Sequence, residues 1–363
     1  MVESSEKKRQ IMKIAIISLA NRLGGTTGDC VQADKTADAL RSLGQDVLRC
    51  FLKGGIVLNS EGLDLGTWQN VLGDYDVVHT IPPIPWTFLK RLPKIKAKLV
   101  CSTVFWRSYT YVRVIHKISR RLTGFALKEY IRVFLAWLGI PSYWSYQGFD
   151  LLLPNSEAEI HCFRRFCHVK ASAKIKAVPN AIDPIPGSVS DIPRPIEAPA
   201  GDYVVVPAVF ATRKNQRSFI EAMNVSRFPI VFLGDGPWLE ECKKIARDGM
   251  YFLGHVAHGS ELFYGLLKYA RVVCLPSNCE TPGIAGLEAA ALGARPVVPR
   301  EGGTEQYYGW EAEYLDPLDA ESIKTAVENA FCRGRIPECN RTRFSQLTWK
   351  LVAERTLSLY QEL

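Results

Sequence analysis

Short apolar runs alternate with segments of helical periodicity along almost the whole chain. The runs are continuous rather than alternating in polarity, which is typical of strands covered on both faces. Ten of them have the length of strands: residues 13–20, 46–52, 76–81, 97–104, 150–156, 203–209, 229–234, 250–256, 271–277 and 295–300. Between the first two, helical spacing places Ala33, Ala37 and Leu40 on one face. The alternation predicts parallel sheets joined by right-handed crossovers.

A proline-rich segment interrupts this rhythm near the middle of the chain. Residues 183–201 contain five prolines, which suit neither a helix interior nor a central strand. A chain of 363 residues also fits about two domains of ordinary size. We therefore expect an α/β fold of two Rossmann-like, doubly wound domains that face each other across a ligand cleft. The expected parts are a domain over 1–184, a linker over 185–201, a domain over 202–344 and a terminal helix over 345–363.

Composition narrows the class of protein. Hydrophobic residues make up 47% and charged residues 23% of the chain, which excludes a disordered or fibrous protein. No apolar run reaches the roughly 18–20 residues that a membrane-spanning helix needs. Ten cysteines form no Cys-x-x-Cys pair and several interrupt apolar runs, which favours reduced thiols in a cytoplasmic protein. The residues 74–76, Asp-Tyr-Asp, precede a strand, so we expect a turn there and no metal.

The net charge of +8 is unevenly distributed. Residues 86–147 hold twelve Lys or Arg against one acid, Glu129, and their cations are interleaved with aromatic residues. The segment could rest on an anionic membrane, bind an anionic acceptor or form a solvated helical face. No nucleic-acid recognition motif accompanies the charge, so we do not expect nucleic acid as a partner.

A glycine-containing loop in the first half of the chain could bind an anion. Gly24, Gly25 and Thr26 follow the first strand and precede a helix, where backbone amides can approach a phosphate. Their spacing does not fit a nicotinamide-dinucleotide fingerprint, and an ordinary turn remains the alternative.

The second half carries a more specific pattern. In the run SNCETPGIAGLE, residues 277–288, two carboxylates lie eight positions apart, at Glu280 and Glu288. Gly283 is expected to open a helix, so the amides of Gly283 and Ile284 could face an anion, and both carboxylates could accept hydrogen bonds from sugar hydroxyls.

Residues 271–309 resemble the donor-site signature of glycosyltransferase family 4, which are retaining enzymes of GT-B fold. The signature comprises a strand with Pro-Ser, the two spaced glutamates, a small-residue helix and a Gly-Gly loop, here LPSNCETPGIAGLEAAALGARPVVPREGGTEQ. The runs LGDGPWLEECKKIA, FLGHV, RKNQ and IKAVPNAID resemble other parts of the family pattern. The last twenty residues resemble its terminal helix, so the resemblance implies that the helix over 345–363 returns to the first domain.

The resemblance implies roles for individual residues. Lys214, with Arg213 as a second cation, should face the donor diphosphate, Glu280 the donor sugar and Glu288 the ribose hydroxyls. Further residues expected at the donor are Gly283, Ile284, Gly234, Gly236, Gly302, Gly303 and Thr304. The loop Gly24, Gly25 and Thr26 is expected opposite the donor site, near the phosphates or the acceptor. Trp106 and Arg107 are expected more weakly on the acceptor side. His79 ends a strand on the cleft side, where it could line the cleft or equally be a structural histidine.

Three departures from the family pattern stand out. The family usually has an arginine five residues before the lysine, where this chain reads Ala208-Val209-Phe210. A histidine usually follows the fourth strand, where this chain has Phe105 and Trp106. The usual Gly-Gly-x-Pro-Glu loop is replaced by residues 302–306, GGTEQ.

The expected activity is transfer of a sugar, with retention of configuration, from a UDP- or GDP-linked donor to a glycan, lipid-linked or small-molecule acceptor. No metal or other cofactor is expected, and the place is the cytoplasm or the inner face of a membrane. The alternative is a catalytically silent GT-B scaffold that binds a nucleotide sugar or a partner enzyme. A dehydrogenase is a more distant third hypothesis.

Overall fold

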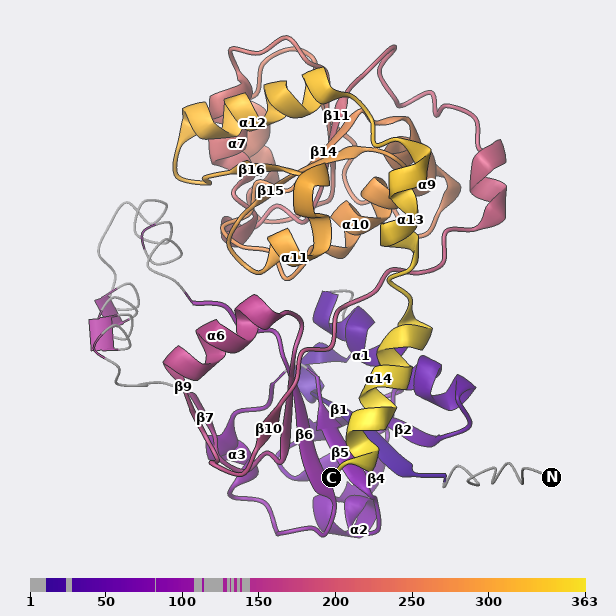
Figure 1. Ribbon diagram of the computed structural model, residues 1–363, viewed down its shortest axis with the longest axis vertical. Helices are drawn as coiled ribbons and strands as arrows, with labels where there is room; N and C mark the ends of the chain where they lie inside the picture. Colours follow the sequence, from indigo (N-terminus) through magenta and orange to yellow (C-terminus); the bar gives the residue numbers. More distant parts are fainter. Residues whose placement is uncertain are drawn as a thin grey trace, which may run out of the picture.

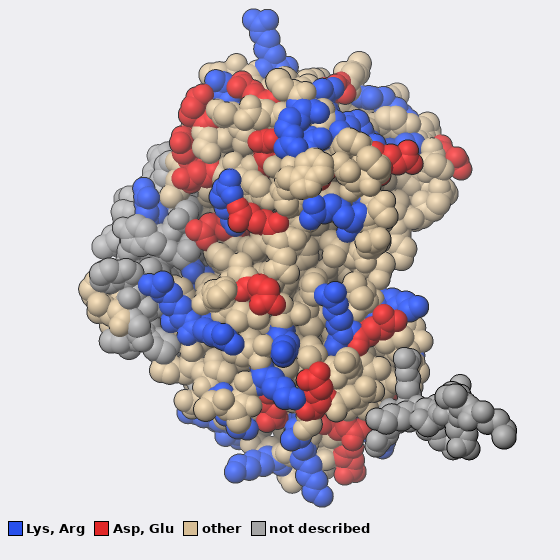
Figure 2. All heavy atoms as spheres, viewed as in Figure 1, with Lys and Arg blue, Asp and Glu red and all other residues tan. Residues whose placement is uncertain are grey.

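The computed structural model describes residues 11–23, 28–81, 83–107 and 144–363, together with isolated positions between 108 and 143. Two units, each built around its own sheet, are stacked along the long axis of the molecule (Figure 1). Figure 2 shows that the surface narrows between the two units on the right of that view. No helix among the described residues is both long enough and apolar enough to cross a membrane.

The first unit has a mixed sheet with strand order β10-β8-β6-β5-β1-β2-β3-β4. Its strands are β1 (Lys13–Leu19), β2 (Asp46–Lys53), β3 (Ile56–Leu58), β4 (Asp64–Thr67), β5 (Val77–Thr80), β6 (Lys98–Thr103), β8 (Leu151–Pro154) and β10 (Lys174–Ile175). A separate two-stranded sheet pairs β7 (Trp144–Tyr146) with β9 (Cys167–Val169). All pairs are parallel except β2 with β3 and β3 with β4.

The helices of the first unit lie between its strands along the chain. They are η1 (Ala20–Arg22), α1 (Gly28–Ser42), α2 (Trp68–Leu72), α3 (Trp86–Leu89) and α6 (Glu157–Phe166). Ala33, Ala37 and Leu40 of α1 are fully buried, as their spacing predicted. The last helix of the chain, α14 (Trp349–Gln361), packs against α1 and completes this core (Figure 1).

The second unit is a parallel sheet with strand order β13-β12-β11-β14-β15-β16. Its strands are β11 (Val204–Pro207), β12 (Ile230–Leu233), β13 (Met250–Phe252), β14 (Val272–Cys274), β15 (Arg295–Pro299) and β16 (Glu313–Leu315). Its helices are η2 (Gly187–Asp191), η3 (Thr212–Lys214), α7 (Gln216–Met223), α8 (Leu239–Ile245), α9 (Glu261–Tyr269), α10 (Ile284–Ala291), α11 (Thr304–Tyr308), η4 (Gly309–Glu311), α12 (Ala320–Arg333) and α13 (Glu338–Ser345). Every one of the ten predicted runs contains a strand of one of the two sheets, which confirms the predicted fold class.

The chain passes between the units twice at neighbouring places. The amide of Ile182 on the outward passage donates to the carbonyl of Leu347 on the return, at 2.9 Å. The proline-rich residues that follow Ile182 lie along the second unit, where Val189 of η2 is buried in the core that includes α9.

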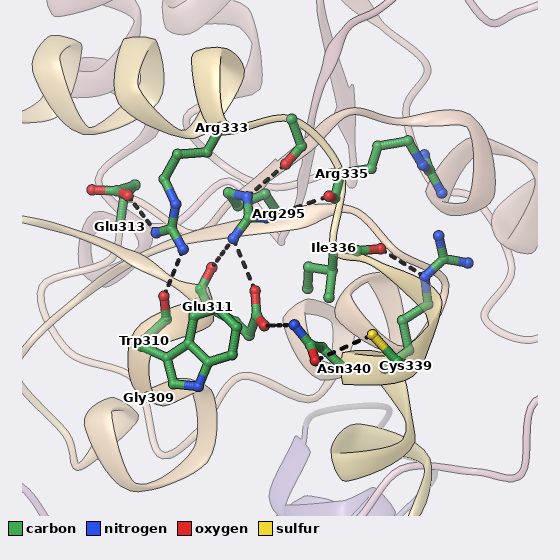
Figure 3. Close-up of polar contacts among 12 residues, drawn as sticks. Arg295, Gly309, Trp310, Glu311, Glu313, Arg333, Arg335, Ile336, Cys339 and Asn340 are labelled. Atoms are coloured by element: carbon green, nitrogen blue, oxygen red, sulfur yellow. Dashed lines mark hydrogen bonds and ion pairs between the residues drawn. The ribbon is translucent and has the colours of Figure 1, made fainter.

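A buried ion pair fixes the connection between α12 and α13 to the sheet of the second unit (Figure 3). Arg295 of β15 pairs with Glu311 at 2.9 Å, and their side chains are 4% and 0% exposed. Arg295 also donates to the carbonyl of Gly334 at 2.5 Å, and the other carboxylate oxygen of Glu311 accepts from Asn340 at 2.8 Å. The charges are therefore satisfied internally, and the cluster has a structural role.

Candidate functional site

The residues predicted to bind a donor lie on loops at one edge of the second sheet. These loops follow β11, β12, β14 and β15, so they leave the sheet at the carboxyl ends of its strands. The strand order reverses between β11 and β14, and ligands of open α/β sheets bind beside such a reversal. Lys214 follows β11 and Glu280 follows β14, so these two residues flank the reversal.

Lys214 and Glu280 form an ion pair across this point. Their Nζ and Oε1 atoms are 2.5 Å apart, and the side chains are only 13% and 6% exposed. The hydroxyl of Ser277 donates to the same carboxylate oxygen, also at 2.5 Å. Burial alone would raise the pKa of Glu280, but the charge and hydrogen bond of Lys214, the Ser277 hydroxyl and the charge of Arg213 together hold it below its usual value. Glu280 is therefore a carboxylate at neutral pH.

The backbone on either side of Lys214 explains where its side chain lies. Asn215 has a left-handed conformation, with φ of 57°, which turns the chain from η3 into α7. The side-chain amide of Asn215 donates to the carbonyls of Pro276 and Pro317, at 3.1 and 3.0 Å. The bond to Pro276 ties this turn to the loop after β14. Arg213 is exposed, and its carbonyl accepts from the amide of Asn278 at 3.0 Å.

The loop that carries Glu280 packs closely on the glycine loop after β15. The amide of Glu280 donates to the carbonyl of Glu301 at 3.0 Å. A Cβ at Gly302 would lie 1.9 Å from the carbonyl oxygen of Glu280, so only glycine fits there. Gly283 precedes the first turn of α10, and within the described part of the chain the amides of Gly283 and Ile284 donate to no acceptor.

Two buried side chains of this region have polar atoms without partners. Glu288 lies in the second turn of α10 with no exposed surface, and His258 binds its Oε1 at 2.8 Å. Its Oε2 has no hydrogen-bond partner in the described structure, and neither do the Oδ1 and Nδ2 atoms of Asn278, a residue 1% exposed. Buried polar atoms without partners are rare and costly in native proteins. Asn278 lies on the loop after β14, as Glu280 does, and Glu288 lies on the helix that follows, so their open polar atoms are what a site completed by a polar ligand would show.

The remaining glycines predicted at the donor have a steric role in the observed packing. Gly234 and Gly236 follow β12 and pack backbone to backbone against Ala208 and Phe210, within 2.5 Å of where a Cβ would stand. The loop after β11, residues 208–210, which lacks the arginine usual in the family, therefore packs against the turn of residues 234–236. Thr304 opens α11, is fully buried and donates to the carbonyl of Pro299 at 2.5 Å.

The first unit meets this edge with the carboxyl ends of its own strands. The indole of Trp106, after β6, donates to Glu301 at 2.5 Å. The hydroxyl of Tyr307 in α11 donates to the carbonyl of Asn155, after β8, at 2.6 Å. The carboxyl edges of the two sheets therefore face each other, as the fold class predicted.

Glu159, which the sequence analysis did not single out, organises this edge of the first unit. It is fully buried and accepts hydrogen bonds from Thr103 Oγ1 and from the amides of Phe105 and Asn155, each at 2.8 Å. Burial raises its pKa from 4.5 to about 8, although these hydrogen bonds act in the opposite direction. The signal for it was present, because Ser156 and Glu159 have the spacing of a helix capping box.

The structure decides between the two alternatives for His79 and rules out a place on the acceptor side. Its ring is 1% exposed, and its two nitrogens lie 2.6 Å from the Tyr360 hydroxyl and 2.9 Å from the Ser102 hydroxyl. Burial lowers its pKa to about 3. His79 is thus a neutral histidine of the core under α14, and it offers no group to an acceptor.

Other predicted acceptor-side residues are placed only in part. Arg107 is half-buried and donates to the carbonyl of Trp106 at 3.2 Å. Gly24, Gly25 and Thr26 lie outside the described residues, between η1 and α1. Most of the segment 86–147 beyond Arg107 lies outside them as well. Among the residues that are described, no three His, Cys, Asp or Glu side chains come together as a metal site requires.

The second unit matches a protein-family model in sequence, and the whole chain is similar in structure to known glycosyltransferases. Residues 201–332 match the family model described as "Glycosyl transferases group 1". No curated protein matches the sequence. Sucrose-phosphate synthase from Thermosynechococcus elongatus is similar in structure, with a TM-score of 0.67 and 16% identity over 97% of this chain and 98% of that one. Anabaena Alr3699/HepE in complex with UDP and glucose has a TM-score of 0.64 and 15% identity over 97% and 100% of the chains.

A third similar structure is WaaG, a glycosyltransferase involved in lipopolysaccharide biosynthesis, with a TM-score of 0.58 and 14% identity over 96% of this chain and 98% of that one. The chain therefore has the GT-B fold, and its second unit carries the sequence pattern of group 1 glycosyl transferases.

Proposed function

We propose that this chain is a retaining glycosyltransferase of the family 4 type, which transfers a sugar from a UDP- or GDP-linked donor to a glycan, lipid-linked or small-molecule acceptor. The donor binds to the second unit, and the acceptor enters from the first. The observation that carries the proposal is the buried Lys214–Glu280 pair at the strand-order reversal of a unit that matches group 1 glycosyl transferases.

The pair supplies what departure of a nucleoside diphosphate needs. Lys214 is a compact cation whose charge offsets the negative charge that grows on the leaving phosphate in the transition state. Arg213, exposed on the same turn, supplies a second positive charge. Glu280 keeps the ammonium group in place before the donor binds, and its carboxylate faces the sugar ring, where positive charge develops as the bond to the phosphate breaks.

The unpartnered atoms near the pair mark the rest of the donor site. Glu288 Oε2 accepts hydrogen bonds from the ribose hydroxyls, and Asn278 gains partners from the diphosphate or the sugar. A ligand that satisfies these atoms removes their burial penalty, which adds to its affinity. A similar GT-B structure, Anabaena Alr3699/HepE, is described in complex with UDP-glucose, which supports a nucleotide-linked donor for this chain.

Retention follows from attack on the same face of the sugar from which the diphosphate leaves. In this scheme the leaving phosphate accepts the proton of the acceptor hydroxyl, and no protein nucleophile is required. Lys214 and the free amides of Gly283 and Ile284 stabilise the diphosphate without a metal ion. Activity should therefore survive a chelator, and loss of activity in EDTA with rescue by manganese or magnesium would contradict this part of the proposal.

A ligand-binding panel tests the donor. Thermal unfolding is followed with UDP, GDP and a set of UDP- and GDP-sugars, because a ligand that binds only the folded state raises the unfolding temperature. One nucleotide series should stabilise the protein, and Glu288→Gln should abolish much of that shift. Binding without any turnover toward acceptors or water would favour the silent-scaffold alternative, and no shift with any nucleotide would refute both.

We further propose that the segment 86–147 rests on an anionic membrane, which would bring the enzyme to a lipid-linked acceptor on the cytoplasmic side. Four apolar residues at helical spacing, Leu127, Ile131, Phe134 and Leu138, are each about half exposed. Lys128 and Arg113 are also exposed. An apolar stripe flanked by cations suits the interface of an anionic bilayer.

Vesicle sedimentation tests this placement. The protein should bind vesicles that contain phosphatidylserine, and binding should weaken steeply with salt, at about 1 kcal/mol per cation near the surface. Neutralising Lys117, Arg120 and Arg121 together should reduce binding without changing nucleotide affinity. Equal binding to neutral vesicles, or no binding to either, would contradict an electrostatic membrane surface.

A further inference from the structure

His258 is the partner of the proposed ribose-binding carboxylate, although no sequence pattern points to it. It lies in the loop between β13 and α9, and its ring packs on Phe263 of α9, with ring centroids 5.0 Å apart. Its Nε2 lies 2.8 Å from Oε1 of Glu288 on α10, the helix that packs beside α9 (Figure 1). The His258 side chain is 46% exposed, whereas Glu288 has no exposed surface.

This arrangement leaves one carboxylate oxygen occupied and the other open. Oε1 of Glu288 accepts from His258, and Oε2 has no partner in the described structure. A carboxylate held by one oxygen has its plane fixed, so the position of the second oxygen is fixed as well. A buried carboxylate with no partner at all would instead tend to take up a proton, because burial disfavours its charged form. A protonated carboxyl accepts fewer hydrogen bonds and would be a poorer ligand for two hydroxyls.

We propose that His258 is a positioning residue for the nucleotide: it holds one carboxylate oxygen of Glu288 and thereby orients the free Oε2 toward the ribose hydroxyls of the donor. This inference rests on the proposed function, because it assigns the partner of Glu288 in the same donor site. His258 acts through Glu288, and it makes no contact of its own with the reacting atoms.

The surroundings of the pair determine how it titrates. Asp183, on the crossing between the units, and Lys35 of α1 both act on His258 and Glu288 by their charges, and they form an ion pair with each other at 2.8 Å. Burial raises the pKa of the Tyr264 and Tyr308 hydroxyls, and the charge of Glu288 acts in the same direction. The hydrogen bond to Glu288 raises the pKa of His258 above its usual 6.5, although burial opposes this. Burial raises the pKa of Glu288, and His258 opposes that rise.

The consequence is a pH dependence of nucleotide binding that belongs to this pair. While His258 is protonated, its charge keeps Glu288 ionised. As the pH rises through the raised pKa of His258, the charge is lost and only a neutral hydrogen bond remains. Glutamine at position 258 can keep a hydrogen bond but never the charge, so it should resemble the wild type at high pH and fall behind at lower pH.

The test measures dissociation constants of UDP and GDP by calorimetry between pH 6 and 8.5. His258→Ala should weaken binding about tenfold at pH 7, the loss expected for one hydrogen bond to a charged group. His258→Gln should bind like the wild type at pH 8.5 and more weakly at pH 6.5. His255 is an exposed histidine of the same loop, so His255→Gln is the matched control. The phosphates of the nucleotide change protonation over this pH range in the same way for every variant, so the control shows how much of the pH dependence comes from the nucleotide itself. Circular dichroism confirms that each variant is folded.

A double variant decides whether His258 acts through Glu288. If it does, His258→Ala combined with Glu288→Gln should bind no more weakly than Glu288→Gln alone. The inference is overturned if the wild type binds a nucleotide and His258→Ala binds it equally well, or if the two losses multiply in the double variant. If neither UDP nor GDP binds the wild type, the proposed function itself fails, and this result is distinct from the other two.

Discussion

Replacing Lys214 by methionine separates the structural role of this residue from its role toward the donor. The change keeps most of the side-chain volume and removes the charge. In the wild type the ion pair with Glu280 is short, at 2.5 Å, and almost entirely shielded from water. After the change, the Ser277 hydroxyl still donates to that carboxylate, but no charge of Lys214 balances it. Breaking a buried pair by removing one partner costs about 3–5 kcal/mol of folding free energy, because a buried charge is left uncompensated.

The loss of stability should depend on pH. In the wild type, Lys214 holds the pKa of Glu280 below its usual value, and this contribution to stability is present above pH 4.5 and lost as the pH falls. In the variant, burial dominates and the pKa of Glu280 rises, so the penalty grows as the pH increases. Urea unfolding should therefore show a small difference between the two proteins near pH 4 and a large one near pH 7. Adding Glu280→Gln to the variant should recover much of the stability at pH 7.

Activity should respond differently from stability. Lys214→Met should lower kcat/KM for the donor about 30- to 900-fold. This corresponds to a loss of about 2–4 kcal/mol of transition-state stabilisation, the loss expected when one hydrogen-bond donor to the transition state is removed. The double variant should regain stability but no activity. Lys243→Met is the matched control, because Lys243 pairs with Glu240 at a similar 2.8 Å on the exposed surface of α8 and should change stability by less than about 1 kcal/mol. A pH-independent loss of stability below about 1 kcal/mol, or activity that returns with stability, would contradict these two roles of Lys214.

Three further predictions concern other carboxylates. Glu288→Ala should mainly raise the donor KM, with a loss of about 1.5–3 kcal/mol of donor-binding free energy, whereas Glu280→Ala should mainly lower kcat in the same steady-state assay. Glu311→Ala should cost about 3–5 kcal/mol in urea unfolding because it strands a buried arginine, and Glu313→Ala, at an exposed pair, should cost less than about 1 kcal/mol. Between pH 4.5 and about 8, folded Glu159 holds a proton that the unfolded chain releases, so stability should fall as the pH rises, and Glu159→Gln should remove that slope in thermal unfolding.

The elements buried on both faces were predictable from the sequence, and the exposed ones were not. Each of the ten apolar runs contains a strand, because a strand that is apolar on both faces is stable only inside a sheet whose two faces are covered by helices. The hairpin of β3 and β4 carries Ile56 and Leu65 on exposed positions, so it has no such signal. Strand β16 begins with a glutamate and is only three residues long, and it too was missed.

The candidate site could be predicted only where neighbouring residues carry the pattern. Glu280 and Glu288 were found because they share one loop and one helix. His258 was missed because its importance depends on a carboxylate thirty residues away, and a single histidine in a loop has no pattern of its own. The sequence left His79 open between the cleft and the core for the same reason: one of the hydroxyls that hydrogen-bond its ring belongs to Tyr360, at the far end of the chain.

The most direct test of the central claim is the configuration of the sugar that the enzyme releases from its donor in the absence of an acceptor. The UDP- or GDP-sugar that stabilises the protein most is incubated with it, and proton NMR follows the anomeric signals from the first minutes, before the free sugar equilibrates. A retaining transferase should slowly release the anomer present in the donor, and Lys214→Met should abolish this release. Release of the opposite anomer, or no release from a saturated wild-type enzyme, would contradict it.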